Sequence, residues 1–140
     1  MTVDLHSLRA LEIINEISQG VYDRQWPLLK RTFDRVECQA CLCLAALLHD
    51  IAKGENSDHA AKGEKMIVRI LQRLGVTGKA IEVVPFLVKH HLLLVNVSQR
   101  RDLSDEKTSV QVAQTIQDKE RLKMLFLLTV ADSFATGPMA

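Results

Sequence analysis

Apolar residues recur at helical spacing along almost the whole chain. In the first stretch most of them fall three residues apart, the spacing of a single buried helix face. The residues of this predicted face are Val3, Leu5, Leu8, Leu11, Ile14 and Ile17. Residues 37–50 are apolar all round, which predicts a buried central helix. Further helices are expected at about 28–36, 57–74, 78–91, 104–116 and 118–134.

Polar segments and segments with glycine or proline separate these stretches. Residues 18–27 carry Gly20 and Pro27 and are expected to form a loop. Residues 95–105, VNVSQRRDLSD, are expected to form another. No stretch alternates between apolar and polar residues beyond the weak LLLVNVS. The chain is therefore predicted to be an all-α bundle of about six to seven helices, whose functional side chains come from helix faces and helix ends.

Length and charge are those of one ordinary globular domain. The 140 residues are expected to form a single domain, 1–140, either excised from a larger chain or a compact stand-alone protein. The net charge of +1 gives no bulk attraction to nucleic acid or to membranes. No signal peptide is seen, and no consecutive apolar run reaches the roughly 18 residues of a membrane span. We expect a cytoplasmic protein with neither nucleic-acid nor membrane partners.

The three cysteines Cys38, Cys41 and Cys43 lie within one predicted helix. Residues two and three apart in a helix are poor disulfide partners, so we expect reduced thiols that pack as small buried residues. A soft-metal site is the less favoured alternative, because a structural zinc would need a fourth ligand.

A histidine and an aspartate, His49 and Asp50, come where the central apolar helix ends. At a helix end both side chains can lean toward a cation placed just beyond it, where the negative end of the helix dipole also favours positive charge. An imidazole with a carboxylate suits manganese, iron, cobalt, zinc or magnesium in an open site. The pair therefore predicts a divalent metal site.

Other parts of the chain offer enough ligands for one or two such ions. His6 and Asp132 are available for the first ion, and Asp132 is an acidic residue inside an apolar helix, where an unpaired charge would be costly. The remaining histidines, His59, His90 and His91, could serve a second ion, with Asp50 bridging the two. The alternative is that these histidines are ordinary core or surface residues, with His90 and His91 forming an exposed helix end.

The order His6, His49-Asp50, Asp132 resembles the metal-dependent phosphohydrolases of the HD-domain family. The stretch AALLHDIAKG matches the core motif of that family almost letter for letter, including Lys53. The resemblance covers essentially the whole chain and implies an HD-domain helical bundle that holds a metal with these residues.

Several further stretches resemble the HD domain of bifunctional PII uridylyltransferase/uridylyl-removing enzymes. They are TVDLHSLRAL, HDIAKG followed by DHA, LVKHHLLL, SQRRDLSD and LTVADSFATGP. In that family the HD domain removes uridylyl groups from a tyrosine of the nitrogen-regulating PII protein. The extra histidines also resemble cyclic-dinucleotide phosphodiesterases, but no Gly-Tyr-Pro motif follows His91. The 140 residues include neither the nucleotidyltransferase domain nor the regulatory domains of that family, so we expect either that neighbouring domains are missing or that the substrate differs.

These resemblances imply an enzyme that hydrolyses a phosphodiester with one or two divalent ions. Asp50 and Lys53 are the candidate catalytic residues, and Lys53, Arg100 and Arg101 are candidates for binding substrate phosphate. The expected substrate is a phosphoester, with uridylylated PII protein as the first candidate. The alternatives are a nucleotide or alarmone phosphohydrolase, a catalytically silent regulatory HD module and a helical interaction domain without metal.

Overall fold

The computed structural model describes residues 2–51, 59–100 and 106–137, and these form eight helices and no strand. The helices are α1 (Val3–Ser18), α2 (Pro27–Asp34), α3 (Gln39–Leu48), α4 (His59–Arg73), α5 (Ala80–Lys89), α6 (Leu93–Arg100), α7 (Glu106–Ile116) and α8 (Lys119–Thr136). The predicted all-α class is confirmed. The extra helix is α6, so the loop expected at 95–105 was wrong for residues 95–100, and residues 101–105 lie outside the described part of the chain.

Side chains cap the N-termini of the first and last helices, α1 and α8. The Thr2 hydroxyl accepts a hydrogen bond from the Leu5 N–H (3.3 Å), and the Asp118 carboxylate accepts one from the Arg121 N–H (2.7 Å). Each cap satisfies one of the backbone donors that the first turn of a helix leaves unpaired. The predicted start of the last helix at Asp118 is thereby confirmed.

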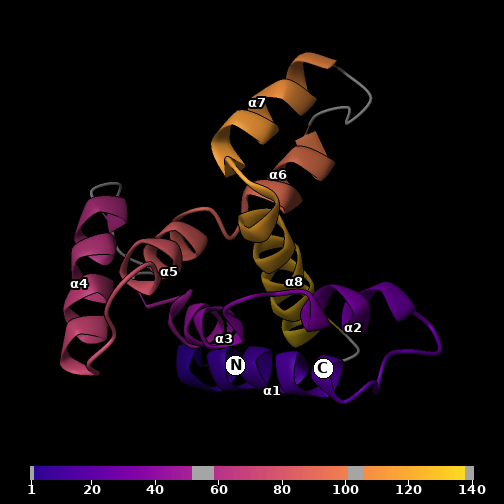
Figure 1. Cartoon of the computed structure of the whole chain (residues 1–140), viewed down its shortest axis with the longest axis horizontal. Coiled ribbons are helices and arrows are strands. Elements are labelled where there is room, and N and C mark those ends of the chain that lie inside the picture. The colour runs from indigo at the N-terminus through magenta and orange to yellow at the C-terminus, as the bar shows by residue number, and fades with distance from the viewer. Residues whose placement is uncertain (1, 52–58, 101–105, 138–140) are drawn as a thin grey trace.

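The core lies where α1, α3 and α8 meet. Figure 1 shows α1 and α3 side by side, with α8 rising from them and α2 beside its lower end. Helix α8 buries residues on more than one of its faces, because α1, α2, α3 and α5 all pack against it. The fully buried side chains of these three central helices include Ile13, Ile14, Ile17, Leu42, Leu125, Leu127 and Leu128. Helix α5 packs on α3 and α4 packs on α5, whereas α6 and α7 extend beyond the start of α8, away from α1.

The buried face of α1 differs from the predicted one in its first two turns. Leu5 and Leu8 are 57% and 52% exposed, whereas His6 and Ala10 are buried. A row spaced three residues apart drifts around a helix of 3.6 residues per turn, so it cannot stay in the core over sixteen residues. The face that stays inward runs back from Ile17 through Ala10 to His6, and it carries a histidine into the interior.

Within the described residues, Ala80–Gln99 is the one segment long and apolar enough by length and composition to cross a membrane. This segment is longer than any uninterrupted apolar run in the sequence, because it also includes polar residues such as Glu82 and Lys89. A turn between Lys89 and Leu93 divides it into α5 and α6, and α5 buries Val84, Pro85 and Leu87 in the bundle. Its length and composition are weak evidence for a membrane span.

The expectation of three reduced cysteines was also wrong. Cys38 and Cys41 form a disulfide, and Cys43 is free and half-buried. Cys38 precedes α3 as its N-cap, with φ −111° and ψ 83°, rather than lying within the helix. This backbone places the two Cα atoms 5.3 Å apart, inside the range that a disulfide spans.

The tyrosine Tyr22 lies in the connection between α1 and α2. The Tyr22 hydroxyl donates a hydrogen bond to the Glu16 carboxylate (2.8 Å), and the Arg9 guanidinium lies 3.4 Å from the same carboxylate. The Tyr22 ring packs against Trp26 and Phe134. Burial, then the hydrogen bond and the negative charge of Glu16, raise the pKa of Tyr22 to about 12.

Tyr22 is the only tyrosine of the chain, so its ionisation can be followed directly by tyrosinate absorbance. We expect it to titrate near pH 12 in the native protein, and the Glu16→Gln variant to titrate closer to 10 because the acceptor loses its charge. Circular dichroism at each pH records that the helices remain folded. An unchanged titration in Glu16→Gln would contradict this packing.

Candidate metal centre

The His-Asp pair lies where α3 ends, as predicted. His49 is the C-cap residue of α3 and Asp50 follows it, and each is only 3% exposed. Helix α3 is apolar on all sides and packs against α1, α5 and α8, so its end lies inside the bundle rather than at the surface. The fold thus places an imidazole and a carboxylate in a buried position.

Two other helices bring a ligand group to the same point. The His6 Nε2 atom from α1 lies 2.6 Å from Oδ1 of Asp132 on α8 and 3.3 Å from Nε2 of His49. The His49 Nε2 atom lies 3.1 Å from the same Asp132 oxygen. Oδ2 of Asp50 is 3.5 Å from both imidazole Nε2 atoms. One atom from each of these four residues therefore lies within 4.8 Å of the others, although they are separated by up to 126 positions in sequence.

The tautomer of His49 is set by the end of its own helix. Its Nδ1–H donates a 2.6 Å hydrogen bond to the carbonyl of Ala46, one of the carbonyls left unpaired at a helix C-terminus. In the neutral ring the lone pair is then on Nε2, which faces His6 and Asp132. This is the arrangement in which a histidine binds a metal through one nitrogen while the backbone orients the other.

The charges of the cluster call for a compensating cation. Burial acts to raise the pKa of Asp132, but hydrogen bonds and charge from His49 and His6 outweigh it and lower that pKa to about 2. Burial acts to lower the pKa of His49, yet its hydrogen bonds to Asp132 and Ala46 outweigh it and raise that pKa. Without a metal, a proton on His49 offsets part of the carboxylate charge. A divalent ion would satisfy two imidazole nitrogens and two carboxylate oxygens at once, a donor set that suits manganese, iron, cobalt or zinc.

A fifth side chain, His91, faces the other oxygen of Asp50. Its Nε2 atom lies 3.8 Å from Asp50 Oδ1, and its ring centre is 5.2 Å from that of His49. Its Nδ1–H donates a 2.6 Å hydrogen bond to the carbonyl of Val88, again at a helix end. Burial lowers the pKa of His91 and favours the neutral ring. Asp50 thus presents one oxygen to His6 and His49 and the other to His91, the geometry of a carboxylate that can bridge two ions.

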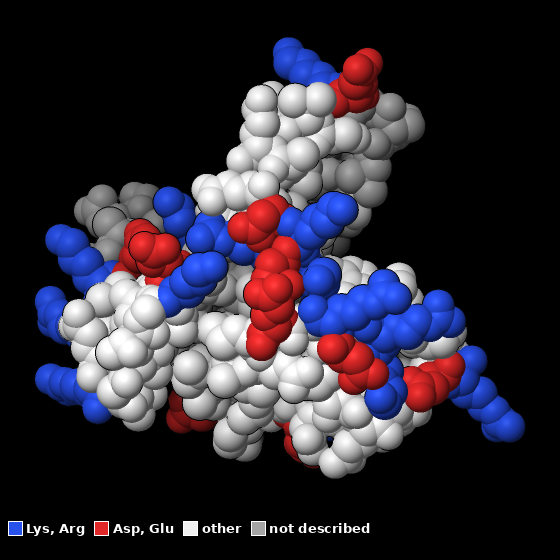
Figure 2. Space-filling model, viewed as in Figure 1, with Lys and Arg blue, Asp and Glu red and all other residues white. Residues whose placement is uncertain are grey.

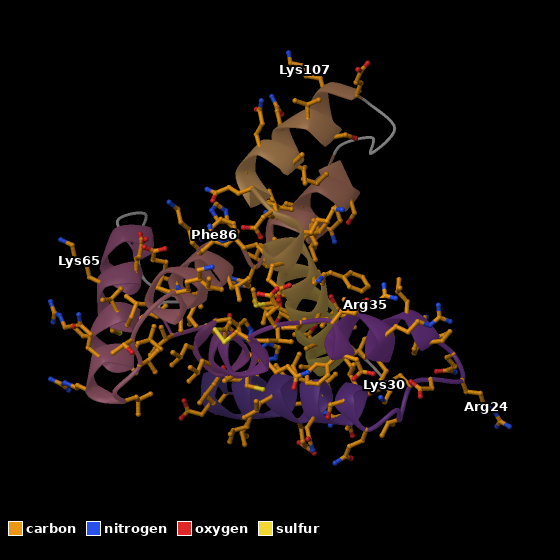
Figure 3. All side chains as sticks on the ribbon, in the orientation of Figure 1. Arg24, Lys30, Arg35, Lys65, Phe86 and Lys107 are labelled. Carbon is orange, nitrogen blue, oxygen red and sulfur yellow. A yellow bond between two sulfur atoms is a disulfide. The ribbon has the colours of Figure 1, made fainter. Side chains whose placement is uncertain are left out.

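The neighbouring His90 faces a different part of the molecule. Its ring centre lies 4.6 Å from that of Phe86, and the guanidinium of Arg121 lies over the same Phe86 ring. Figure 3 shows Phe86 on the side of α5 that faces α8. The structure therefore brings the ring of His91, and not that of His90, beside Asp50 and His49. The geometry favours His91 over His90 as a ligand.

Four other predicted site residues cannot be placed. Lys53 and Arg101 lie outside the described residues, and so do the side chains of His59 and Arg100. Their proposed roles in metal or phosphate binding stay predictions.

The carbonyls of Ala46 and Val88 were not anticipated from the sequence. Both belong to the residue three positions before a histidine at a helix end. The signal was available, because a histidine just after an apolar helical stretch is placed to bond one of the unpaired carbonyls.

Comparison with known families agrees with this geometry. The family described as HD domain matches residues 3–136. Bifunctional uridylyltransferase/uridylyl-removing enzymes from Zymomonas mobilis, Novosphingobium aromaticivorans and Azospirillum brasilense are 41%, 39% and 40% identical to the chain over 137 residues. These alignments cover 98% of this chain and 15% of each relative, so the chain spans about one seventh of their length. No solved structure matches.

Metal content after loading with Mn²⁺ and desalting is expected to be one to two ions per chain by elemental analysis. His49→Ala and Asp50→Ala should retain less than about a tenth of this, because each removes a buried ligand of the cluster. His90→Ala should match the wild type, since its ring lies against Phe86.

Circular dichroism of each variant separates ligand loss from unfolding. A folded wild type that binds no Mn²⁺, Fe²⁺, Co²⁺ or Zn²⁺ would contradict the site. Equal metal loss in His90→Ala and His91→Ala would contradict the assignment of His91.

Proposed function

The chain belongs to the HD domain family, and from that premise we propose that it is a metal-dependent phosphohydrolase that cleaves a phosphodiester. The observation that carries the proposal is the buried group of His6, His49, Asp50 and Asp132. A hydrolytic metal centre requires a set of buried donor groups of this kind to hold its ions.

In this proposal the residues of the cluster would bind divalent ions. His6, His49, Asp50 and Asp132 would hold a first divalent ion, and Asp50 with His91 would contribute to a second. Bound ions would polarise the phosphoryl oxygens and make water a stronger nucleophile at neutral pH. The carbonyls of Ala46 and Val88 hold His49 and His91 with Nε2 toward the site. Asp50, with Oδ2 toward His6 and His49 and Oδ1 toward His91, would contribute an oxygen to each ion.

The substrate we propose is a uridylyl group esterified to a tyrosine, as on uridylylated PII protein. Support comes from the relatives, whose name includes a uridylyl-removing activity and which are about 40% identical over 98% of the chain. The reaction needs no dedicated general acid, because a phenol with a pKa of about 10 is a good leaving group. Lys53, Arg100 and Arg101 would bind the substrate phosphates. We place this activity in the cytoplasm, and the transferase activity in the relatives' name is not assigned to the chain.

An aryl uridylate such as uridine 5′-(4-nitrophenyl phosphate) tests the proposal. With Mn²⁺ present we expect steady release of nitrophenol, no phosphate release from free nucleoside monophosphates and no phosphate or pyrophosphate release from guanosine tetraphosphate. Asp132→Asn should lower the rate at least about 100-fold, because the amide does not supply the anionic ligand. The matched control Asp34→Asn changes an exposed carboxylate on α2 that pairs with Lys30, and should keep the wild-type rate.

Two results would replace this function with another. Release of phosphate from nucleoside monophosphates, or of pyrophosphate from guanosine tetraphosphate, without cleavage of the aryl ester, would identify a nucleotide or alarmone phosphohydrolase. A metal-loaded protein that turns over none of these substrates would be a regulatory module that binds metal without catalysis.

A further inference from the structure

Two cysteines at the start of α3 are joined by a disulfide at the far end of that helix from His49 and Asp50. Cys38 is the N-cap residue and is half-buried, whereas Cys41 lies in the first turn and is 2% exposed. Their Cα atoms are 5.3 Å apart, so the fold holds the two sulfur atoms within bonding reach. Figure 3 shows the bond at α3. The disulfide supplies no ligand to the metal cluster and plays no part in the proposed hydrolysis.

The surroundings favour reaction at Cys38 rather than at Cys41. The Cys41 N–H donates a hydrogen bond to Cys38 Sγ (3.2 Å), and a helix N-terminus stabilises a negatively charged sulfur. A cavity of about 300 Å³ lies beside the pair and is lined by Lys79 and Arg121 as well as by acidic side chains. Figure 2 shows acidic and basic side chains intermixed on this face of the molecule. The cavity therefore gives a small reagent access to the half-buried sulfur, with Lys79 and Arg121 as the cationic groups on its lining.

The third cysteine has a different environment. Cys43 lies two residues further along α3, is half-buried and is unpaired. Burial raises the pKa of its thiol, which disfavours the reactive thiolate. It serves as an internal reference for the reactivity of the pair.

We propose that Cys38 and Cys41 are a reversible redox site that exchanges with low-molecular-weight disulfides of the glutathione type. The Cys38 thiolate attacks one sulfur of glutathione disulfide, which forms a mixed disulfide on Cys38 and releases one glutathione thiolate. The Cys41 thiolate then attacks Cys38 Sγ, forms the Cys38–Cys41 bond and releases the second glutathione. The two cysteines are oxidised, glutathione disulfide is reduced to two thiols, and the two cysteine protons end on those thiols.

Two structural features support a reversible bond over a permanent one. The bond closes a loop across only three sequence positions, so it adds little constraint to a fold that already has an apolar core. Two hydrogen bonds also hold the segment before α3 against α8, independently of the disulfide. The Glu37 N–H donates to the Glu120 carboxylate (2.6 Å), and the Lys123 ammonium donates to the Arg35 carbonyl (3.2 Å). The bundle is therefore expected to stay folded when the pair is reduced.

The test follows thiol status in the intact chain, in glutathione redox buffers that contain a metal chelator. After acid quenching and alkylation, mass spectrometry should show that Cys38 and Cys41 lose their thiols together as the buffer becomes more oxidising. Cys43 should remain alkylatable throughout. Excess dithiothreitol should restore both thiols without denaturant, and circular dichroism should show the same helix content in both states.

Single substitutions identify the attacking sulfur. Cys41→Ser should accumulate one glutathione adduct on Cys38, whereas Cys38→Ser should form at least about 10-fold less adduct on the buried Cys41. Cys43→Ser is the matched control and should oxidise like the wild type. Cys38 and Cys41 that stay free in the most oxidising buffer would overturn the proposal, as would a bond that resists dithiothreitol in the folded protein.

Discussion

Two carboxylates and two imidazoles meet in the interior of this bundle, and the other features of the site depend on how their charge is balanced. Burial of ionised carboxylates is unfavourable unless positive charge or hydrogen-bond donors lie close by. Asp132 and Asp50 have the imidazoles of His6 and His49 beside them, and neutral imidazoles leave the two carboxylate charges uncompensated. A divalent ion compensates the two carboxylates with a single group, which explains why an apolar bundle would keep four polar side chains at the junction of α1, α3 and α8.

The fold controls the site through helix ends as much as through helix faces. His49 and His91 each follow an apolar helix, and each donates its Nδ1–H to a carbonyl in the last turn of that helix. The same interaction therefore closes two helices and turns two imidazoles toward Asp50. Because the ligands come from α1, α3 and α8 and from the end of α5, the cluster requires the folded bundle and cannot form from one local segment.

The sequence was sufficient to predict the helical class and the four residues of the central cluster. His49 and Asp50 were identifiable because they end an apolar helix, and Asp132 because it is acidic within one. Two details required the structure. The inward face of α1 was misassigned because Leu5 and Leu8 fit a repeat of three, whereas the helix turns His6 inward. The choice between His90 and His91 depended on the direction of the chain after Lys89, which apolar periodicity does not encode.

The cysteine pair and α6 were missed for a related reason. Both predictions depended on where a helix begins or ends, and pattern locates helix ends less well than helix centres. Placing Cys38 one residue before α3 rather than inside it changes an unfavourable disulfide geometry into a favourable one. Residues 95–100 carry polar side chains and still belong to helix α6. The apolar residues of α6 face the rest of the protein, with Val97 buried and the others partly buried.

Nitrogen-15 NMR of the histidine rings, recorded during titration with diamagnetic Zn²⁺, tests the central claim most directly. The five imidazoles of the chain report their protonation and coordination separately. We predict that Nε2 of His6 and Nε2 of His49 move to the shifts of metal-bound nitrogen while Nδ1 of His49 stays protonated, and that His90 does not respond. Coordination through Nδ1 of His49, or rings of His6 and His49 that ignore saturating Zn²⁺, would contradict the account.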